Sequence, residues 1–223
     1  MTPILSNKII INIIPFLLGL LTSFSLPPYN LLIINFITFP ILLLFLIFNY
    51  KNGKWISFNI GWMFGFGYFI SNLYWIANSL TFEETFKPLI PFAIIIIPLF
   101  LGLFYAVATL VCSFFKLKKN FFSILIFATI FSLIEYIRGF ILSGFPWNLI
   151  VYSWTNYLNS LQILSLIGTY SFNLISITLF SLPLVFFFNK SFKFKSISII
   201  FLLIILLLNH FYGYQKIKND EKL

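Results

Sequence analysis

The sequence predicts an all-α, polytopic transmembrane helical bundle, and two observations lead to that fold class. Hydrophobic residues make up 61% of the 223 residues and charged residues only 9%, against about 25% charged residues in a typical soluble domain. The apolar residues also lie in long runs, close to the roughly 20 residues that a helix needs to cross the hydrocarbon core. A chain with this composition is typical of a multi-pass membrane protein.

Seven apolar runs, separated by charged or proline- and glycine-containing connections, are candidate spans. They are Ile9–Leu26, Leu31–Phe48, Trp55–Leu80, Leu89–Phe115, Phe121–Arg138, Gly168–Phe188 and Ile197–Tyr214. Lys8 and the first apolar run also resemble a signal peptide, but the spans that follow favour an uncleaved first helix. The apolar stretch Leu158–Ile167 has two interpretations: it lies along the interface, or it lengthens the sixth span.

The basic residues indicate how these spans are oriented. With the N-terminus inside, nine basic residues lie on the cytoplasmic side: Lys8, Lys51, Lys54, Lys116, Lys118, Lys119, Lys190, Lys193 and Lys195. Five lie on the other side, or two without the C-terminal tail: Lys87, Arg138, Lys216, Lys218 and Lys222. Basic residues favour cytoplasmic connections, so we expect the N-terminus in and the C-terminus out. The transmembrane domain then covers residues 1–214, and residues 215–223 form a short external polar tail.

Several classes of site and partner are disfavoured by the composition. The net charge of +9 lies in short loops between spans, so it indicates topology and we expect no nucleic-acid partner. The single cysteine, Cys112, excludes an intrachain disulfide and a multi-cysteine metal site, and the single histidine, His210, excludes a histidine cluster. We therefore expect no metal and no cofactor. Cys112 lies near the cytoplasmic end of the fourth span, the wrong side for external chemistry.

Two motifs predict local geometry rather than chemistry. Pro27 and Pro28 cannot continue a helix, so they predict a tight external hairpin between the first two spans. Gly61 and Gly65 open the third span as a Gly-x-x-x-Gly pair, which lets a neighbouring backbone approach closely. We expect helix packing at that pair.

The stretch Glu135–Trp147 is the most informative part of the chain. Glu135 and Arg138 lie one helical turn apart at the end of an uncharged apolar run, where residues at i and i+3 can pair on one face. Ionisable groups in or beside lipid are expensive, so such a pair marks a candidate functional site. Two interpretations stay open: the pair fixes helix packing, or Arg138 binds a lipid phosphate through its planar guanidinium while Glu135 orients it.

The turn that follows carries further candidate residues. Pro146 fixes its own φ, Gly144 permits unusual backbone angles, and Trp147 adds an amphipathic indole. Trp75 belongs to a second polar and aromatic group, at the outer end of the third span. For Pro146, Trp147 and Trp75 the alternatives are an aromatic belt at the bilayer interface and a share in a lipid-binding site.

Together these motifs resemble the apolipoprotein N-acyltransferase family over essentially the whole chain. The matching elements are the Pro27–Asn30 loop, Gly65-Phe66-Gly67 leading to Tyr74-Trp75, Glu135 with Arg138-Gly139, Gly144-Phe145-Pro146-Trp147, and Ile167–Phe172. The most specific part is Glu-x-x-Arg-Gly followed by Gly-Phe-Pro-Trp.

The resemblance implies a protein of the bacterial cytoplasmic (inner) membrane whose helices surround an external nitrilase-like domain with a Glu-Lys-Cys catalytic set. The cysteine of that set takes an acyl chain from a phospholipid as a thioester and passes it to the amino group of a diacylated lipoprotein. Trp147 matches a functional tryptophan of the family, while Glu135 and Arg138 match motif positions. After the seventh span this sequence has only residues 215–223, and no residue stands for the catalytic set.

We therefore expect the membrane domain of an apolipoprotein N-acyltransferase-like protein, which by itself transfers no acyl group. The alternative is a non-catalytic membrane anchor or a subunit that docks lipids or a partner. The candidate partners are a phospholipid, a diacylated lipoprotein and a separately encoded nitrilase-like domain. The candidate lipid- or substrate-binding residues are Glu135, Arg138, Trp147, Pro146 and Trp75, and no catalytic residue is assigned.

Overall fold

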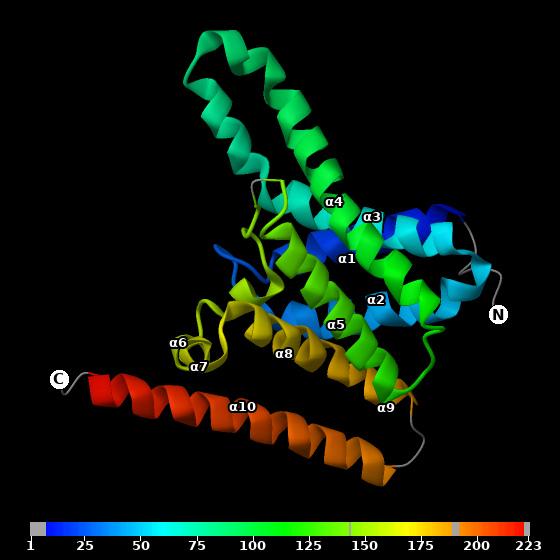
Figure 1. Cartoon of the computed structure of the whole chain (residues 1–223), viewed down its shortest axis with the longest axis vertical. Helices are drawn as coiled ribbons and strands as arrows, with labels where there is room; N and C mark the ends of the chain where they lie inside the picture. The colour runs from blue at the N-terminus through cyan, green and yellow to red at the C-terminus, as the bar shows by residue number, and fades with distance from the viewer. Residues whose placement is uncertain (1–7, 143, 189–191, 221–223) are drawn as a thin grey trace.

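The computed structural model describes residues 8–142, 144–188 and 192–220, and these residues form helices joined by turns (Figure 1). The α-helices are α1 (Lys8–Ser23), α2 (Asn35–Asn49), α3 (Lys54–Asn72), α4 (Ile90–Phe114), α5 (Phe121–Arg138), α6 (Leu158–Leu161), α7 (Leu164–Ile167), α8 (Thr169–Ser181), α9 (Val185–Phe188) and α10 (Phe192–Asp220). Short 3-10 helices are η2 (Leu32–Ile34), η3 (Tyr50–Asn52), η4 (Tyr74–Thr81), η5 (Glu84–Leu89), η6 (Ile150–Trp154) and η7 (Leu182–Leu184). No strand occurs within these ranges, so the predicted all-α class is confirmed.

Helical structure covers every one of the predicted spans. Among the described residues, four segments are long and apolar enough to cross a membrane: Leu32–Asn49, Glu84–Phe114, Phe121–Arg138 and Thr169–Phe188. The apolar helix Ile9–Ser23 is shorter. In Figure 1 the long helices run back and forth, and α1 begins and α10 ends at opposite sides of the bundle. The chain is a membrane protein by helix length and composition, while the count of seven spans and their orientation remain predictions.

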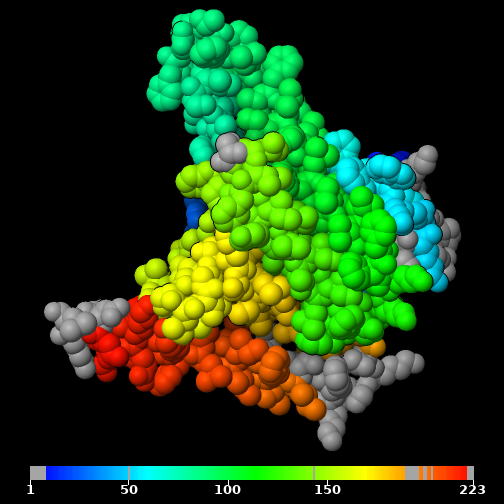
Figure 2. Space-filling view, in the orientation of Figure 1, coloured from blue at the N-terminus to red at the C-terminus, as the bar shows by residue number. Residues whose placement is uncertain are grey.

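The third predicted span, Trp55–Leu80, is too long by about two turns. Helix α3 ends at Asn72, and the chain continues as the 3-10 helix η4. The hydroxyl groups of Ser79 and Thr81 each donate to the carbonyl three residues earlier at 2.7 Å. Such local side-chain bonds compete with α-helix. The segment from η4 to the start of α4 forms an arm that protrudes from the bundle (Figures 1 and 2).

The conformation of Gly168 decides between the two interpretations of Leu158–Ile167. Its φ of +76° and ψ of 168° break the helix before α8, in a backbone region that is essentially open only to glycine. Residues 158–167 form the two short helices α6 and α7, which Figure 1 shows nearly end-on while α8 runs across the view. The prediction of a longer sixth span is therefore wrong. Helices α6 and α7 run in a different direction from α8, which agrees with the interfacial interpretation.

Helix α10 extends beyond the predicted seventh span, Ile197–Tyr214, at both ends. It runs from Phe192 to Asp220, so residues 215–220 of the predicted polar tail are helical. In Figure 1 it lies along one side of the bundle, antiparallel to α8.

Glycines bring α3 close to the backbone of α4, as the Gly-x-x-x-Gly pair predicted. A Cβ added at Gly61 would lie 2.1 Å from Thr109 Oγ1, and one at Gly65 would lie 2.7 Å from the Cα of Gly102. On the other side of α3, a Cβ at Gly67 would lie 2.1 Å from the Phe16 carbonyl oxygen of α1. Helices α1, α3 and α4 therefore form a tightly packed layer.

A cluster of buried aromatic rings joins that layer to α5. The ring centroids of Phe69 and Tyr105 are 5.5 Å apart, and those of Tyr105 and Phe131 are 5.4 Å apart. Tyr68 packs against the same rings, with its centroid 5.9 Å from that of Tyr105. These rings carry the hydroxyl groups of Tyr68 and Tyr105 to the end of α5, where the candidate site lies.

Candidate functional site

Glu135 and Arg138 pair at the end of α5, as their spacing predicted. Arg138 Nη2 lies 3.6 Å from Glu135 Oε1, and both side chains are fully buried. The pair therefore lies inside the helical bundle. Because burial of two charges costs several kcal/mol each, such a pair needs further hydrogen bonds to be stable.

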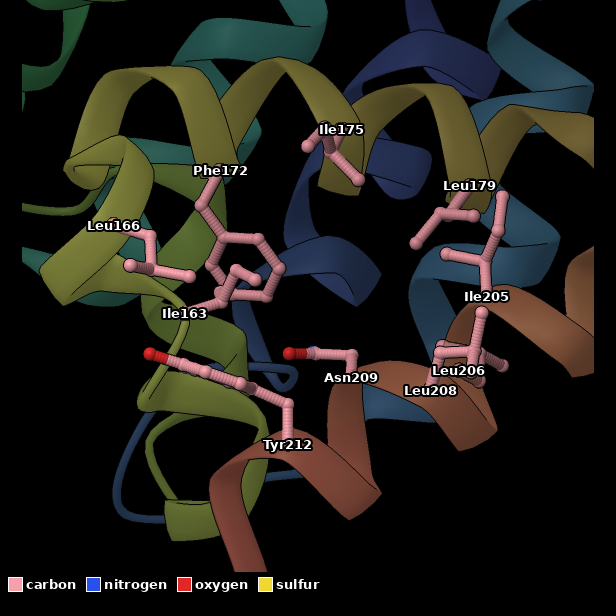
Figure 3. Close-up of a pocket in the computed structure, with 10 residues that line it drawn as sticks. All are labelled: Ile163, Leu166, Phe172, Ile175, Leu179, Ile205, Leu206, Leu208, Asn209 and Tyr212. Carbon is pink, nitrogen blue, oxygen red and sulfur yellow. The ribbon is translucent and has the colours of Figure 1, made fainter. Parts of the chain in front are cut away.

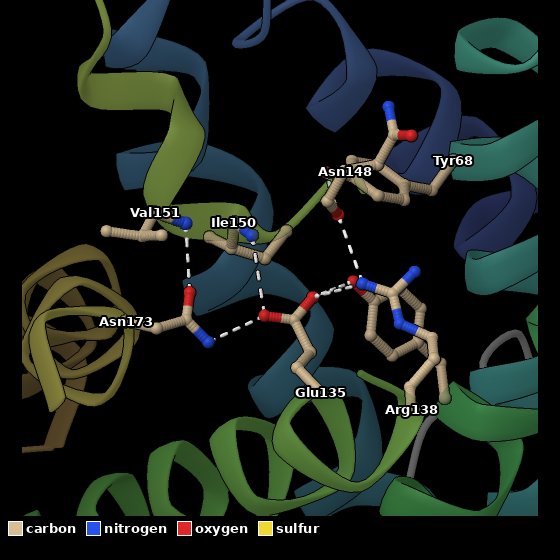
Figure 4. A network of polar contacts seen from close by, with 8 residues as sticks. Tyr68, Glu135, Arg138, Asn148, Ile150, Val151 and Asn173 are labelled. Carbon is tan, nitrogen blue, oxygen red and sulfur yellow. Dashed lines mark hydrogen bonds and ion pairs between the residues drawn. The ribbon is translucent and has the colours of Figure 1, made fainter. Parts of the chain in front are cut away.

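Three donors from other parts of the chain satisfy the Glu135 carboxylate (Figure 4). The Tyr105 hydroxyl of α4 donates to Oε1. The Asn173 side-chain amide of α8 donates to Oε2 at 2.6 Å, and the Ile150 backbone N–H donates to the same oxygen at 3.4 Å. One carboxylate thus connects α4, α5, α8 and η6.

Asn173 extends this network by accepting a bond as well as donating one. The Val151 backbone N–H donates to Asn173 Oδ1 at 2.9 Å, and the Asn173 side chain is fully buried. Sequence reasoning missed this residue. A single amide inside an apolar span is an available signal, since polar residues within spans usually face the bundle interior.

Arg138 is held by one carbonyl oxygen and two aromatic rings. Its Nη2 donates to the Asn148 carbonyl oxygen at 3.3 Å, and the Tyr68 hydroxyl donates to the same oxygen at 3.1 Å. The guanidinium carbon lies 5.0 Å from the Phe69 ring centroid and 5.8 Å from that of Phe145. Arg138 Nε and Nη1 are buried and find no hydrogen-bond acceptor in the part of the chain that the structure describes.

An apolar cavity of about 360 Å³ adjoins this arginine. It is lined by Ile96, Ile97, Phe100, Leu101 and Phe104 of α4, and by Arg138, Ile141, Leu142, Gly144 and Phe145. Arg138 is the one charged residue among these lining residues. The site therefore combines an apolar cavity with a buried cation, two of whose nitrogen atoms find no acceptor among the described residues.

The turn after α5 closes back onto the helix end. The Phe145 N–H donates to the Arg138 carbonyl oxygen at 2.9 Å. Gly144 has a φ of +79°, and a Cβ there would lie 2.6 Å from the Gly139 carbonyl oxygen. A side chain at residue 144 would be strained by this backbone angle and would clash with the Gly139 carbonyl oxygen, so the turn requires glycine.

The other candidate residues lie on the surface of the molecule. Trp147 is 61% exposed and Trp75, on η4, is 49% exposed, and Pro146 is exposed as well. The structure thus brings together Glu135 and Arg138, while Phe69 and Phe145, rather than the tryptophans, cover the guanidinium. A role for Trp147, Pro146 and Trp75 in lipid binding stays a prediction.

Residues with metal-binding or nucleophilic chemistry do not gather at this site. Within the described ranges no three His, Cys, Asp or Glu side chains lie close enough to hold a metal ion. Cys112 is fully buried near the far end of α4.

Comparison with known proteins identifies the family. Residues 18–182 match the model of the apolipoprotein N-acyltransferase N-terminal domain. The chain belongs to this family. Residues 18–182 include the whole Glu135–Arg138 network, so the candidate site lies within the family domain, whereas α10 lies beyond it.

Curated relatives carry the same family name. The "Apolipoprotein N-acyltransferase" of Brucella melitensis is 33% identical over 176 residues, which are 75% of this chain and 33% of the relative. That of Rhodopseudomonas palustris is 35% identical over 178 residues, 78% of this chain and 33% of the relative. That of Rhizobium rhizogenes is 30% identical over 194 residues, 80% of this chain and 36% of the relative. The chain thus spans about a third of the length of these relatives.

Proposed function

We propose that this chain is the membrane domain of a protein that N-acylates lipoproteins, and that it holds the phospholipid acyl donor at Arg138. In this proposal it spans the bacterial cytoplasmic membrane seven times, with the Arg138 site at the external end. The family membership and the names of the relatives support the acyl-transfer part. A nitrilase-like domain, in the same or a separate chain, would carry out the transfer to a diacylated lipoprotein.

One observation carries the lipid-binding part: a buried arginine beside an apolar cavity has two nitrogen atoms for which the described residues provide no hydrogen-bond acceptor. Buried polar groups are nearly always hydrogen-bonded, so an exception calls for a ligand or another explanation. The guanidinium fork suits the oxygen atoms of a phosphate.

The apolar walls select the class of anion. Residues such as Ile97, Phe100 and Phe104 offer no polar group to a small soluble ion, but they suit an acyl chain. A neutral lipid would leave the arginine donors unused. A molecule with both a phosphate and an acyl chain, a phospholipid, satisfies both parts of the site.

Phospholipid bound to the purified chain, counted by native mass spectrometry, tests this proposal. Charge-assisted hydrogen bonds are worth roughly 1.5–3 kcal/mol, so Arg138→Gln should weaken phospholipid occupancy by about one to two orders of magnitude. Arg138→Lys should restore it only in part, because an ammonium lacks the planar fork. Lys87→Gln, which removes an exposed cation from the arm, is the matched control and should leave occupancy unchanged.

Loss of folding must be separated from loss of the ligand. Arg138→Gln leaves Glu135 as an unpaired buried charge, whereas Glu135→Gln with Arg138→Gln removes both charges and should restore thermal stability. That double variant should still bind phospholipid poorly. A stably folded double variant with the full phospholipid occupancy would show that the pair is structural and would end the proposal.

A further inference from the structure

Helix α10 and helix α8 run side by side but are held apart along their middle. The close backbone contacts of α10 are with α6 and, near its start, with α9. A Cβ at Gly213 would lie only 1.7 Å from the Asn159 carbonyl oxygen, and the Asn209 amide donates to the Ser160 carbonyl oxygen at 3.2 Å. Helix α6 is therefore a spacer that fixes one end of α10 at a distance from α8.

An apolar groove lies between the two helices. It consists of two cavities of about 350 and 270 Å³, which share Ile175, Leu179 and Ile205. Figure 3 shows the larger one, with Phe172 and Ile175 reaching down from α8 toward Leu206 and Asn209 of α10. The smaller cavity lies beside it and reaches Phe201 of α10, with Phe121 and Leu125 of α5 as a further wall. The two cavities therefore lie next to each other along α10, and together they are called the groove.

The dimensions and chemistry of this groove suit a hydrocarbon chain. Apolar cavities do not hold water, and an empty one would forfeit the packing contacts of its walls. From Phe201 to Tyr212 the groove follows α10 for about 16 Å, at 1.5 Å per residue. This is close to half of the roughly 30 Å hydrocarbon core, the depth of one leaflet.

A cation, Lys216, lies one helical turn beyond Tyr212, the last groove residue of α10, at the end of the groove next to α7. Lys216 Nζ donates to Ser165 Oγ at 2.6 Å, and the next residue of α7, Leu166, lines the groove. The groove therefore pairs an apolar channel of one-leaflet length with a positive charge at its end.

We propose that the groove between α8 and α10 binds one acyl chain of an anionic phospholipid, whose phosphate lies at Lys216. This site is separate from the Arg138 cavity and does not depend on the proposed function. Helix α10 lies outside residues 18–182, the part of the chain that matches the family domain.

Photo-crosslinking of the unaltered chain tests the location of the lipid. The chain is placed in vesicles that contain phosphatidylglycerol with a photoreactive group in its acyl chain, and labelled residues are mapped by mass spectrometry. We expect the groove residues Ile175, Leu179 and Ile205 to be labelled more strongly than Ile13 and Leu17, which lie on the exposed face of α1. Even labelling of both sets, or protection of the groove by another protein segment, would overturn the proposal.

Two substitutions test the fit and the charge. Ile175→Trp should fill the groove and lower retained phosphatidylglycerol by about fivefold, while Ile13→Trp, the same change on α1, should have no effect. Lys216→Gln should abolish the preference for phosphatidylglycerol over phosphatidylcholine. Both effects should persist in an Arg138→Gln background, which separates this site from the other one. An equal loss in the Ile175 and Ile13 variants would contradict the groove site.

Discussion

At the scale of single residues, the Glu135 carboxylate is stable in the bundle because four groups meet it. Tyr105, Asn173 and the Ile150 N–H donate to its two oxygen atoms, and Arg138 supplies the opposite charge. A buried charge that loses such partners costs far more than the bonds are worth in water. The network therefore fixes the relative positions of α4, α5 and α8 around the site.

Asn173 allows this argument to be tested away from the charged pair. Asn173→Leu leaves the Val151 N–H and one Glu135 oxygen atom without their best partner. We expect the free energy of unfolding to fall by about 2–4 kcal/mol, since each unsatisfied buried group costs about 1–3 kcal/mol. Unfolding of the variant in detergent measures this change. Asn156→Leu, the same substitution at an exposed position, is the control. Equal stability of the two variants would show that the network contributes little.

The sequence predicted half of this network, for a physical reason. Glu135 and Arg138 are neighbours on one helix, so their contact follows from helical periodicity alone. Tyr105 and Asn173 come from α4 and α8, and their contact depends on which faces of three helices meet. The burial of Arg138 beneath Phe69 also depends on that packing, which is why an arginine expected beside lipid lies inside the bundle.

At the scale of helices, close packing of α3 on α4 depends on the absence of side chains. The nearest atoms to an added Cβ at Gly61 are Thr109 Oγ1 at 2.1 Å and the Tyr105 carbonyl oxygen at 2.2 Å. Thr109 is itself fixed, since its hydroxyl donates to the Ser57 carbonyl oxygen at 2.7 Å. Neither helix can therefore absorb a methyl group without moving.

Gly61→Ala should separate α3 from α4 and lower the free energy of unfolding by about 1–3 kcal/mol, the usual cost of overpacking. Val107→Ile adds the same single carbon to α4 but on its exposed face, so it should be neutral. Thermal unfolding of both variants gives the comparison. The Gly61 variant should also lose phospholipid occupancy, because Tyr105 connects this contact to Glu135. A neutral Gly61→Ala would show that the two helices adjust.

Helix ends were less predictable than helices. Each predicted apolar run contains a helix, because burial in lipid requires about 20 apolar residues whatever the tertiary structure, while the number of membrane crossings stays a prediction. The segment η4 still contains Trp75, Ile76 and Leu80 among its polar residues, and no glycine or proline marks the point where α3 ends at Asn72. Gly168, in contrast, marks the start of α8 because its positive φ stops a helix from continuing.

At the scale of the whole molecule, the buried network and the end of the groove near Lys216 lie on the same side of the bundle. The turn after α5 and helices α6 and α7 occupy the end of the molecule where α10 finishes (Figure 1). The connections after α2 and α4 lie at the opposite end. Both lipid sites that we propose would therefore open toward one leaflet, and the orientation of the chain decides which leaflet that is.

The lysine distribution makes that orientation testable. Nine basic residues fall on the side of the N-terminus, against two on the other side before the tail, so we expect the N-terminus in the cytoplasm and the Arg138 site outside. Alkaline phosphatase, active only outside, and green fluorescent protein, fluorescent inside, are fused after Lys119 and after Lys222. Fluorescence at the first position and phosphatase activity at the second are expected.

Replacing Lys51, Lys54, Lys116, Lys118 and Lys119 with glutamine should weaken this preference, because it removes the charges that set it. Phosphatase activity after Lys119 in the unaltered chain would reverse the orientation and would place both lipid sites in the cytoplasmic leaflet, where they cannot serve an external acyl transfer.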